Sequence, residues 1–270
     1  MKFTLYRAAM GGMAALCLGL SAHPAMAGSL LKDGFAFPAG TPVKIAVFRP
    51  DVQVGTLRTG GVDEPNADWT AQARTNLQSA FEGASDARDA QMVFLGEPDG
   101  ENAKLLNDYR ALFQIVSKEI LGHGVFVDRL PTKKVPGKTG DPVRHNLDWT
   151  LGGGAQKLKQ VTGADYALFV YTHDSYGSAG RKAAQLFAAA LLGVYVAPGV
   201  HIGYAGLVDL NTGDMKWFNA DIQMGGDPRT TDGAAKRVGE LLRNFPKNGT
   251  APAVAVAQAP AAAASTPAAH

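Results

Sequence analysis

The cluster His173-Asp174-Ser175 contains the residue types that carry out nucleophilic catalysis. A Ser-His-Asp triad works only when the three side chains converge in space. Consecutive residues at the end of a strand cannot do this, because successive side chains point to opposite faces. The chain also lacks the G-x-S-x-G motif of α/β-hydrolases. We therefore expect ordinary turn residues here, assign no catalytic residue and predict that the protein is not an enzyme.

The end of a buried strand is nevertheless a common place for a ligand in an α/β sheet. A periplasmic small-ligand binder or hydrolase is therefore the alternative function. Its candidate ligand-binding residues are His173, Asp174, Ser175, Tyr176 and His201, and the loop 51–66 is expected to contribute to the same site.

Metal and cofactor motifs are weak in this sequence. No two histidines have the i, i+4 spacing of a helical metal site, and H-E-x-x-H does not occur. A site assembled through space from His173, Asp174 and His201 is the remaining metal hypothesis, and we predict no metal. Gly137-Lys138-Thr139 resembles the end of a phosphate-binding loop, but Thr132 stands where that loop requires glycine. We predict no cofactor.

Residues 183–208 contain no Asp, Glu, Lys or Arg. Such a run can be a membrane-inserting segment, a buried helix followed by a buried strand, or an exposed apolar surface that binds another protein. Glycine and proline interrupt it before the roughly 20 residues of a membrane span are reached, and we favour the buried interpretation. If the surface is exposed, its candidate residues are Leu186, Phe187, Leu191, Leu192 and Tyr195.

Residues 1–27 have the pattern of a secretory signal peptide. A basic start is followed by an apolar stretch and by Ala25-Met26-Ala27, which fits an A-x-A cleavage site. We predict cleavage after Ala27, a periplasmic location and no transmembrane segment in the mature chain. Cys17, the single cysteine, follows Leu16 instead of the small residue that a lipoprotein signal requires, so we expect it to be removed with the signal peptide.

The 243 residues after Ala27 are long enough to bury a sizeable core. They carry 24 basic and 24 acidic side chains, and this balance gives no indication of a nucleic-acid partner. The basic stretch 131–146 is expected to be a solvated loop. The Ala/Pro-rich stretch 247–270 is expected to be a disordered tail.

Strand and helix patterns alternate between residues 42 and 246. This order predicts one α/β domain, a mixed sheet with helices packed on it. Residues 28–41 read as a lead-in and 51–66 as a Gly-rich loop, with Asp68 as a helix N-cap. Strands are predicted at 42–48, 91–95, 125–128, 167–172, 200–208 and 215–218, and helices at 69–81, 101–121, 148–162, 181–192 and 230–245.

Three short motifs have a familiar arrangement: Lys44-Ile45-Ala46-Val47, Gly163-Ala164-Asp165-Tyr166, and the stretch from Leu207 to Trp217. With them the chain resembles bacterial envelope proteins of anticodon-binding-domain-like fold. These are the periplasmic part of the curli secretion lipoprotein, the lipoprotein activators of penicillin-binding proteins and the N-terminal domain of TolB. The resemblance implies a non-catalytic assembly or protein–protein interaction role in the cell envelope, with an envelope protein or a second copy as partner. No functional residue transfers by motif.

Overall fold

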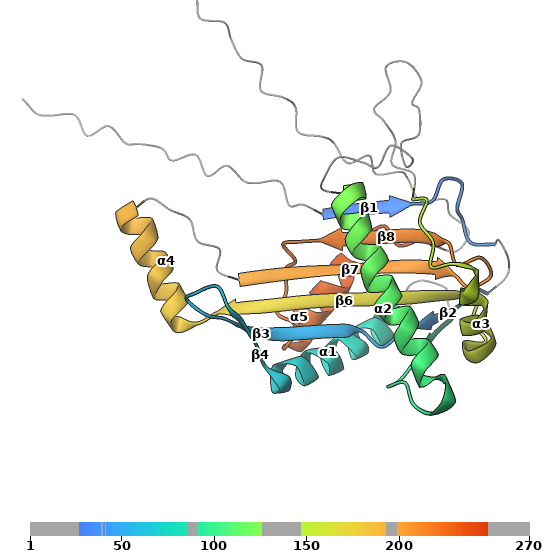
Figure 1. The fold of residues 1–270 in the computed structure, drawn as a ribbon, viewed down its shortest axis with the longest axis horizontal. Helices are drawn as coiled ribbons and strands as arrows, with labels where there is room; N and C mark the ends of the chain where they lie inside the picture. The colour runs from blue at the N-terminus through green and yellow to red at the C-terminus, as the bar shows by residue number, and fades with distance from the viewer. Residues whose placement is uncertain are drawn as a thin grey trace, which may run out of the picture.

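The computed structural model in Figure 1 describes residues 27–38, 40, 42–85, 91–125, 147–192 and 199–247. Its eight strands form one mixed sheet in the order β1-β8-β7-β6-β2-β5, and the β3–β4 hairpin continues the sheet beside β6. The strands are β1 (Ala27–Leu31), β2 (Lys44–Val47), β3 (Asp51–Leu57), β4 (Asp63–Pro65), β5 (Gln91–Phe94), β6 (Tyr166–Gly177), β7 (Gly199–Asp209) and β8 (Met215–Asp221).

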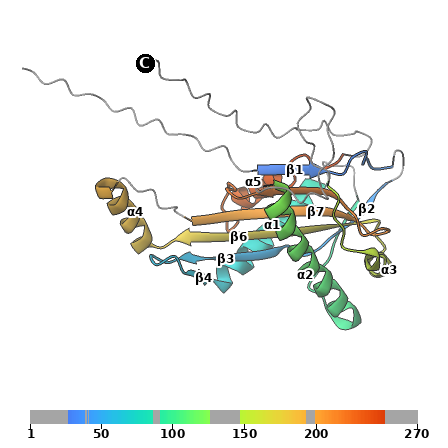
Figure 2. The same ribbon diagram turned by 45° about the horizontal axis from the view of Figure 1, so that its top comes forward.

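Helices cover both faces of this sheet. α1 (Ala67–Ser85) and α5 (Thr231–Leu241) pack on one face, whereas α2 (Ala103–Ile120) and α3 (Gln156–Thr162) pack on the other. Short helical turns flank α2 and precede α3, at Gly100–Asn102, Leu121–Val125 and Gly153–Ala155. α4 (Ala179–Leu192) lies at one end of the molecule, away from the other helices, in both Figure 1 and Figure 2.

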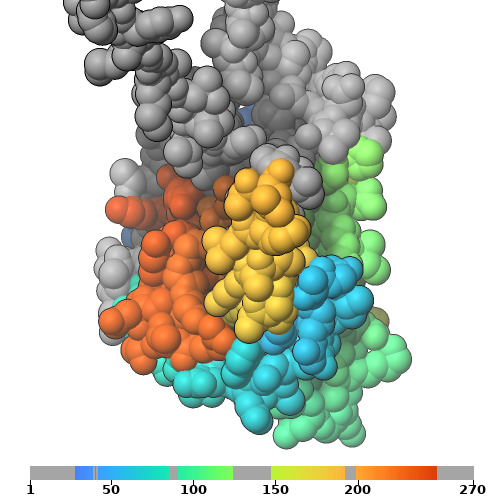
Figure 3. Space-filling model, turned by 90° about the vertical axis from the view of Figure 1, so that its left-hand side faces the viewer, coloured from blue at the N-terminus to red at the C-terminus, as the bar shows by residue number. Residues whose placement is uncertain are grey.

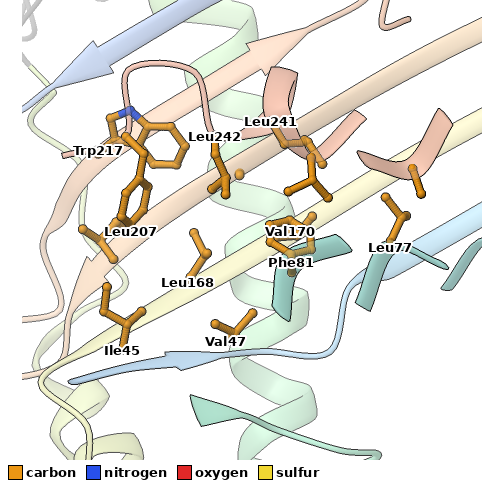
Figure 4. Packing of buried hydrophobic residues seen from close by; sticks show 14 of the residues in the cluster. Ile45, Val47, Leu77, Phe81, Leu168, Val170, Leu207, Trp217, Leu241 and Leu242 are labelled. Atoms are coloured by element: carbon orange, nitrogen blue, oxygen red, sulfur yellow. The ribbon is translucent and has the colours of Figure 1, made fainter. Parts of the chain in front are cut away.

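The central strand β6 lies between the two hydrophobic cores, one on each face of the sheet. It pairs with β2 and β3 in parallel and with β7 in antiparallel register. Leu168 and Val170 point into the core beneath α1 and α5 (Figure 4), and Ala167 and Phe169 point into the core beneath α2. Burying each large apolar side chain contributes about 1.5–3 kcal/mol. The continuous apolar run at the start of β6 therefore stabilises the fold through side chains on both faces of the sheet.

The predicted α/β class and the mixed sheet are confirmed, but two segments differ from expectation. Residues 51–66, predicted as a loop, form β3, β4 and the turn between them. Val52 and Val54 alternate toward the core, and Gly55 is required because a Cβ there would lie 2.6 Å from the Glu64 carbonyl oxygen. The lead-in contains β1, which pairs with β8. These three strands were not predicted because none has a long apolar run.

Several boundaries also moved. Asn66, not Asp68, caps α1, since its Oδ1 accepts a hydrogen bond from the Trp69 amide at 2.9 Å. The helix predicted from residue 148 begins only at Gln156, after the positive φ of Gly152. Three predicted segments lie largely outside the described residues. They are the strand at 125–128, of which only Val125 is described, in the turn after α2, the basic stretch 131–146, and the stretch 247–270 beyond its first residue.

Replacing Phe113 by alanine tests the core beneath α2. Phe113 is 2% exposed and stacks on Phe169 with ring centroids 4.9 Å apart. We expect Phe113→Ala to lower the free energy of unfolding by about 3–5 kcal/mol in urea titration. Ile115, on the same helix but 60% exposed, is the control, and Ile115→Ala should change it by less than about 0.5 kcal/mol. Equal effects would show that α2 does not pack as described.

Candidate functional site

The five candidate ligand-binding residues divide between the two faces of the sheet. β6 continues through Gly177, so His173 to Tyr176 are strand residues, and their interpretation as a turn is wrong. Asp174 and Tyr176 therefore face α1 and α5, together with His201 of the neighbouring β7. His173 and Ser175 face the opposite side.

A closed charge cluster surrounds Asp174. The side chains of Asp174 and Arg237 are both fully buried, and the guanidinium donates to Oδ2 at 3.1 Å and to Oδ1 at 2.8 Å. Arg237 also donates to the carbonyl oxygens of Gly225 at 2.9 Å and Gly226 at 2.6 Å. His201 Nδ1 lies 2.7 Å from Asp174 Oδ1. A buried ion pair is tolerated when its remaining hydrogen-bonding groups are satisfied in this way. Arg237 therefore links the β8–α5 connection, which contains Gly225 and Gly226, to Asp174 of β6.

A second polar layer covers this cluster. The Tyr176 hydroxyl donates to Asp227 Oδ1 at 2.8 Å, and Arg229 binds the same carboxylate through Nε at 2.9 Å and Nη2 at 2.7 Å. The guanidinium carbon of Arg229 also lies 3.8 Å from the Tyr176 ring centroid and 4.4 Å from that of Trp69, a cation–π arrangement. Hydrogen bonding from Arg229 lowers the pKa of Asp227 to about 2, and burial raises the pKa of Tyr176.

Sequence reasoning missed the partners in this layer. Asp227, Thr230 and Asp232 are the caps that the sequence offers for the last helix, and Thr230 is the cap, its hydroxyl accepting from the Gly233 amide. The contacts of Arg229 with Trp69 and Tyr176 have no local signature, because these residues are far apart in the chain.

On the opposite face, Asp63 joins the remaining two candidates. His173 Nε2 lies 2.6 Å from Asp63 Oδ2, and the buried Ser175 hydroxyl donates to Asp63 Oδ1. In a catalytic triad the histidine lies between serine and carboxylate and takes the serine proton. Here the carboxylate lies between the other two, and the described residues show no His173–Ser175 hydrogen bond. This arrangement does not activate Ser175.

The through-space metal hypothesis does not match the geometry. His173 points to the face opposite Asp174 and His201. Within the described ranges, no group of three His, Cys, Asp or Glu residues is placed to hold a metal ion.

The apolar candidate surface is exposed, and the favoured interpretation of a buried helix is wrong. Leu186, Phe187 and Leu191 are 74%, 64% and 64% exposed on α4, and no described side chain of this helix is buried. The side chain of Leu192 and the whole of Tyr195 lie outside the described residues. The strand half of that prediction is right, because β7 is buried from Gly203 to Val208. None of the described helices is long and apolar enough to cross a membrane.

No family model and no curated protein matches this chain. Among solved structures it is similar to a PelC dodecamer from Paraburkholderia phytofirmans, with 10% identity, 80% of this chain and 93% of that chain covered, and a TM-score of 0.32. It is also similar to lipoprotein GNA1162 from Neisseria meningitidis, with 16% identity, 66% of this chain and 80% of that chain covered, and a TM-score of 0.26. The match to the LpoB C-terminal domain from Salmonella enterica has 13% identity, covers 71% of this chain and 87% of that chain, and has a TM-score of 0.24. The predicted resemblance to bacterial lipoproteins is thereby confirmed, and the one to TolB stays a prediction. At these scores we draw no conclusion about function from the matches.

Arg237→Met should be among the most damaging substitutions in the chain. It leaves the buried Asp174 charge with His201 as its remaining side-chain hydrogen-bond partner among the described residues, and breaking a buried ion pair costs about 3–5 kcal/mol. Chemical denaturation measures the loss. The exposed neighbour Lys236→Met is the control, with an expected change below about 0.5 kcal/mol. Adding Asp174→Leu to Arg237→Met should recover part of the lost free energy of unfolding, because no unpaired charge then remains buried. If the double variant recovers nothing, the ion-pair explanation is contradicted.

Asp227 should make the free energy of unfolding depend on pH in the acid range. Its folded pKa of about 2 lies below the ordinary value of about 3.9. The carboxylate therefore stabilises the fold above about pH 4, and this contribution is lost as the pH falls toward 2. We expect the difference in unfolding free energy between wild type and Asp227→Asn to narrow over that interval. Repeating the comparison in an Arg229→Met background is the control, since removing the main cause of the shift should flatten the pH dependence.

Proposed function

We propose that this protein is an exported, non-catalytic interaction module of the bacterial cell envelope. The observation that carries the proposal is the exposed apolar helix α4, which contacts its partner through Leu186, Phe187 and Leu191. The proposed location is the periplasm, reached through the signal peptide and cleavage after Ala27. The partner is another envelope protein, and a second copy of this chain is the alternative partner.

The way α4 is connected supports a role outside the fold. β6 and β7 are antiparallel neighbours, and a turn of two residues can join such strands. Here 21 residues separate Gly177 from Gly199, and they include the whole of α4. Sheet formation does not need this helix, and none of its described side chains belongs to either core. Its apolar surface is therefore explained by contact with another molecule.

Exposed apolar side chains are concentrated at this end of the molecule. Val62, at the tip of the β3–β4 hairpin, is 65% exposed. The hairpin lies beside the start of α4, because Arg181 Nη1 donates to the Arg58 carbonyl oxygen at 3.3 Å (Figure 3). Four of the six exposed large apolar side chains among the described residues are on these two elements. An amphipathic helix that docks in a groove presents such a row of anchors.

The polar clusters support the non-catalytic part of the proposal. Asp174 is neutralised by Arg237, Asp227 by Arg229, and Asp63 holds both His173 and Ser175. General acid–base catalysis requires a titratable group within reach of a substrate proton. In this protein those carboxylates are already engaged with internal partners.

The test is chemical crosslinking in intact cells with tagged full-length protein and mass spectrometry. Replacing Leu186, Phe187 and Leu191 by glutamine should abolish the crosslink to a discrete envelope protein. It should change the free energy of unfolding of the purified protein by less than about 0.5 kcal/mol per site, since these side chains are exposed.

The matched control is Ile115→Gln, an equally apolar and 60% exposed site on α2, which should keep the crosslink. Crosslinks that survive in the α4 variant would contradict this surface. Recovery of self-crosslinked protein alone would show that the partner is a second copy.

A further inference from the structure

The first strand of the sheet begins at the bond that the sequence marks for cleavage. β1 starts at Ala27 and pairs with β8 in the register Ala27↔Asp221, Gly28↔Ala220 and Ser29↔Asn219. Cleavage after Ala27 leaves Gly28 as the first residue of the mature protein, already within the strand. The predicted cleavage point thus lies at the edge of the sheet.

The residue opposite the cleavage point is a buried carboxylate. Asp221 is 4% exposed, and its Oδ1 accepts a hydrogen bond from the Gln223 amide at 2.9 Å. Its cation among the described residues is Arg243, whose Nη2 lies 3.8 Å from Oδ2, beyond hydrogen-bond range, on a side chain that is 44% exposed. A buried carboxylate held this loosely is costly, and a closer cation would stabilise it.

Cleavage supplies such a cation. Hydrolysis of the Ala27–Gly28 peptide bond adds one water: the Ala27 carbonyl leaves as a carboxylate, and the Gly28 nitrogen becomes an amine that is protonated at neutral pH. The neutral amide with one donor is replaced by an ammonium group with three. Paired residues of antiparallel strands have Cα atoms about 4.5–5.5 Å apart. The Gly28 nitrogen lies between the pairs Ala27↔Asp221 and Gly28↔Ala220, so the register places it across from the Ala220–Asp221 peptide, beside Asp221.

We infer that the α-amino group of Gly28 binds Asp221, so that removal of the signal peptide completes the β1 edge of the sheet. This inference rests on the proposed export and cleavage. The rest of β1 is fixed independently of the new charge. Leu30 and Leu31 pack against the two cores, and the Ser29 hydroxyl accepts a hydrogen bond from Trp217 Nε1 at 3.2 Å. The ammonium group is therefore delivered by a strand that is already positioned.

The experiment compares two purified proteins that differ only at the N-terminus. One begins at Gly28 with a free amine, released from a fusion by a protease that leaves no extra residue. The other carries Ala25-Met26-Ala27 in front of it, which moves the ammonium group away from Asp221. We expect the folding equilibrium constant of the first to be about fivefold larger, as for a favourable ion pair. In Asp221→Asn the two proteins should be equally stable.

The matched control is Asp214→Asn, at the other end of the same strand pair. Asp214 Oδ2 accepts from Lys32 Nζ at 3.0 Å, so its loss should lower the stability of both proteins equally and preserve the difference between them. Equal stability of the two wild-type proteins, or a difference that survives in Asp221→Asn, would overturn the inference.

The pH dependence provides a second readout that needs no substitution. In the described part of the chain, the charged side chains near the new terminus are Asp221 of β8 and Arg243 after α5. An α-amino group titrates near about pH 8. The carboxylate raises its pKa in the folded protein, so the difference should be full below about pH 7 and vanish as the pH rises past about 9. A difference independent of pH would also overturn the inference. The mass of the protein purified from the periplasm tests cleavage separately.

Discussion

The buried charge of Asp174 constrains the path of every element around the end of β6. Asp174 has no exposure to solvent, and an ionised carboxylate cannot remain there without a cation and further hydrogen-bond donors. Arg237 provides them, which requires α5 to cross this part of β6. The same guanidinium binds the carbonyl oxygens of Gly225 and Gly226, so the β8–α5 connection must pass directly over it. Gly226 makes that path available through its positive φ of 76°, in a place where a Cβ would lie 2.3 Å from the Gly233 carbonyl oxygen.

This constraint explains how the long strands can extend beyond the apolar cores. β6 and β7 run for 12 and 11 residues, and the polar residues His173, Asp174 and Ser175 follow the apolar first half of β6. Polar pairs form there on both faces: Asp174 with Arg237 and His201 on one, Asp63 with His173 and Ser175 on the other. The strands therefore remain ordered out to the point where α4 begins. α4 follows the end of β6 and lies away from the other helices.

Much of the fold could be predicted from the sequence, and the failures have physical causes. The central strand and α2 have long apolar patterns, so their type and position followed from periodicity. β1 and β3 are short or polar on one face, and pairing with neighbours distant in the chain decides their conformation. The candidate residues lie in the last part of β6, but His173-Asp174-Ser175 were interpreted as a turn because polar residues commonly follow the end of a strand. The tertiary partners Asp63, Asp227 and Arg237 could not be assigned to these residues, because such contacts leave no mark on local spacing. α4 was predicted as a helix from its composition, but composition alone does not distinguish a buried apolar helix from an exposed one.

A functional surface is best sought where local chemistry is unsatisfied. In the described part of the chain, the polar groups that first suggested catalysis are satisfied within the protein, by opposite charges or by backbone carbonyl groups. Leu186, Phe187 and Leu191 have no such compensation: each exposes apolar surface whose burial is worth about 25 cal/mol per Å². A stable monomer gains nothing from holding these side chains in water on a helix that its sheet does not need. Burial of these side chains against another molecule would release that free energy, and for this reason the proposed function rests on α4 and not on the histidine cluster.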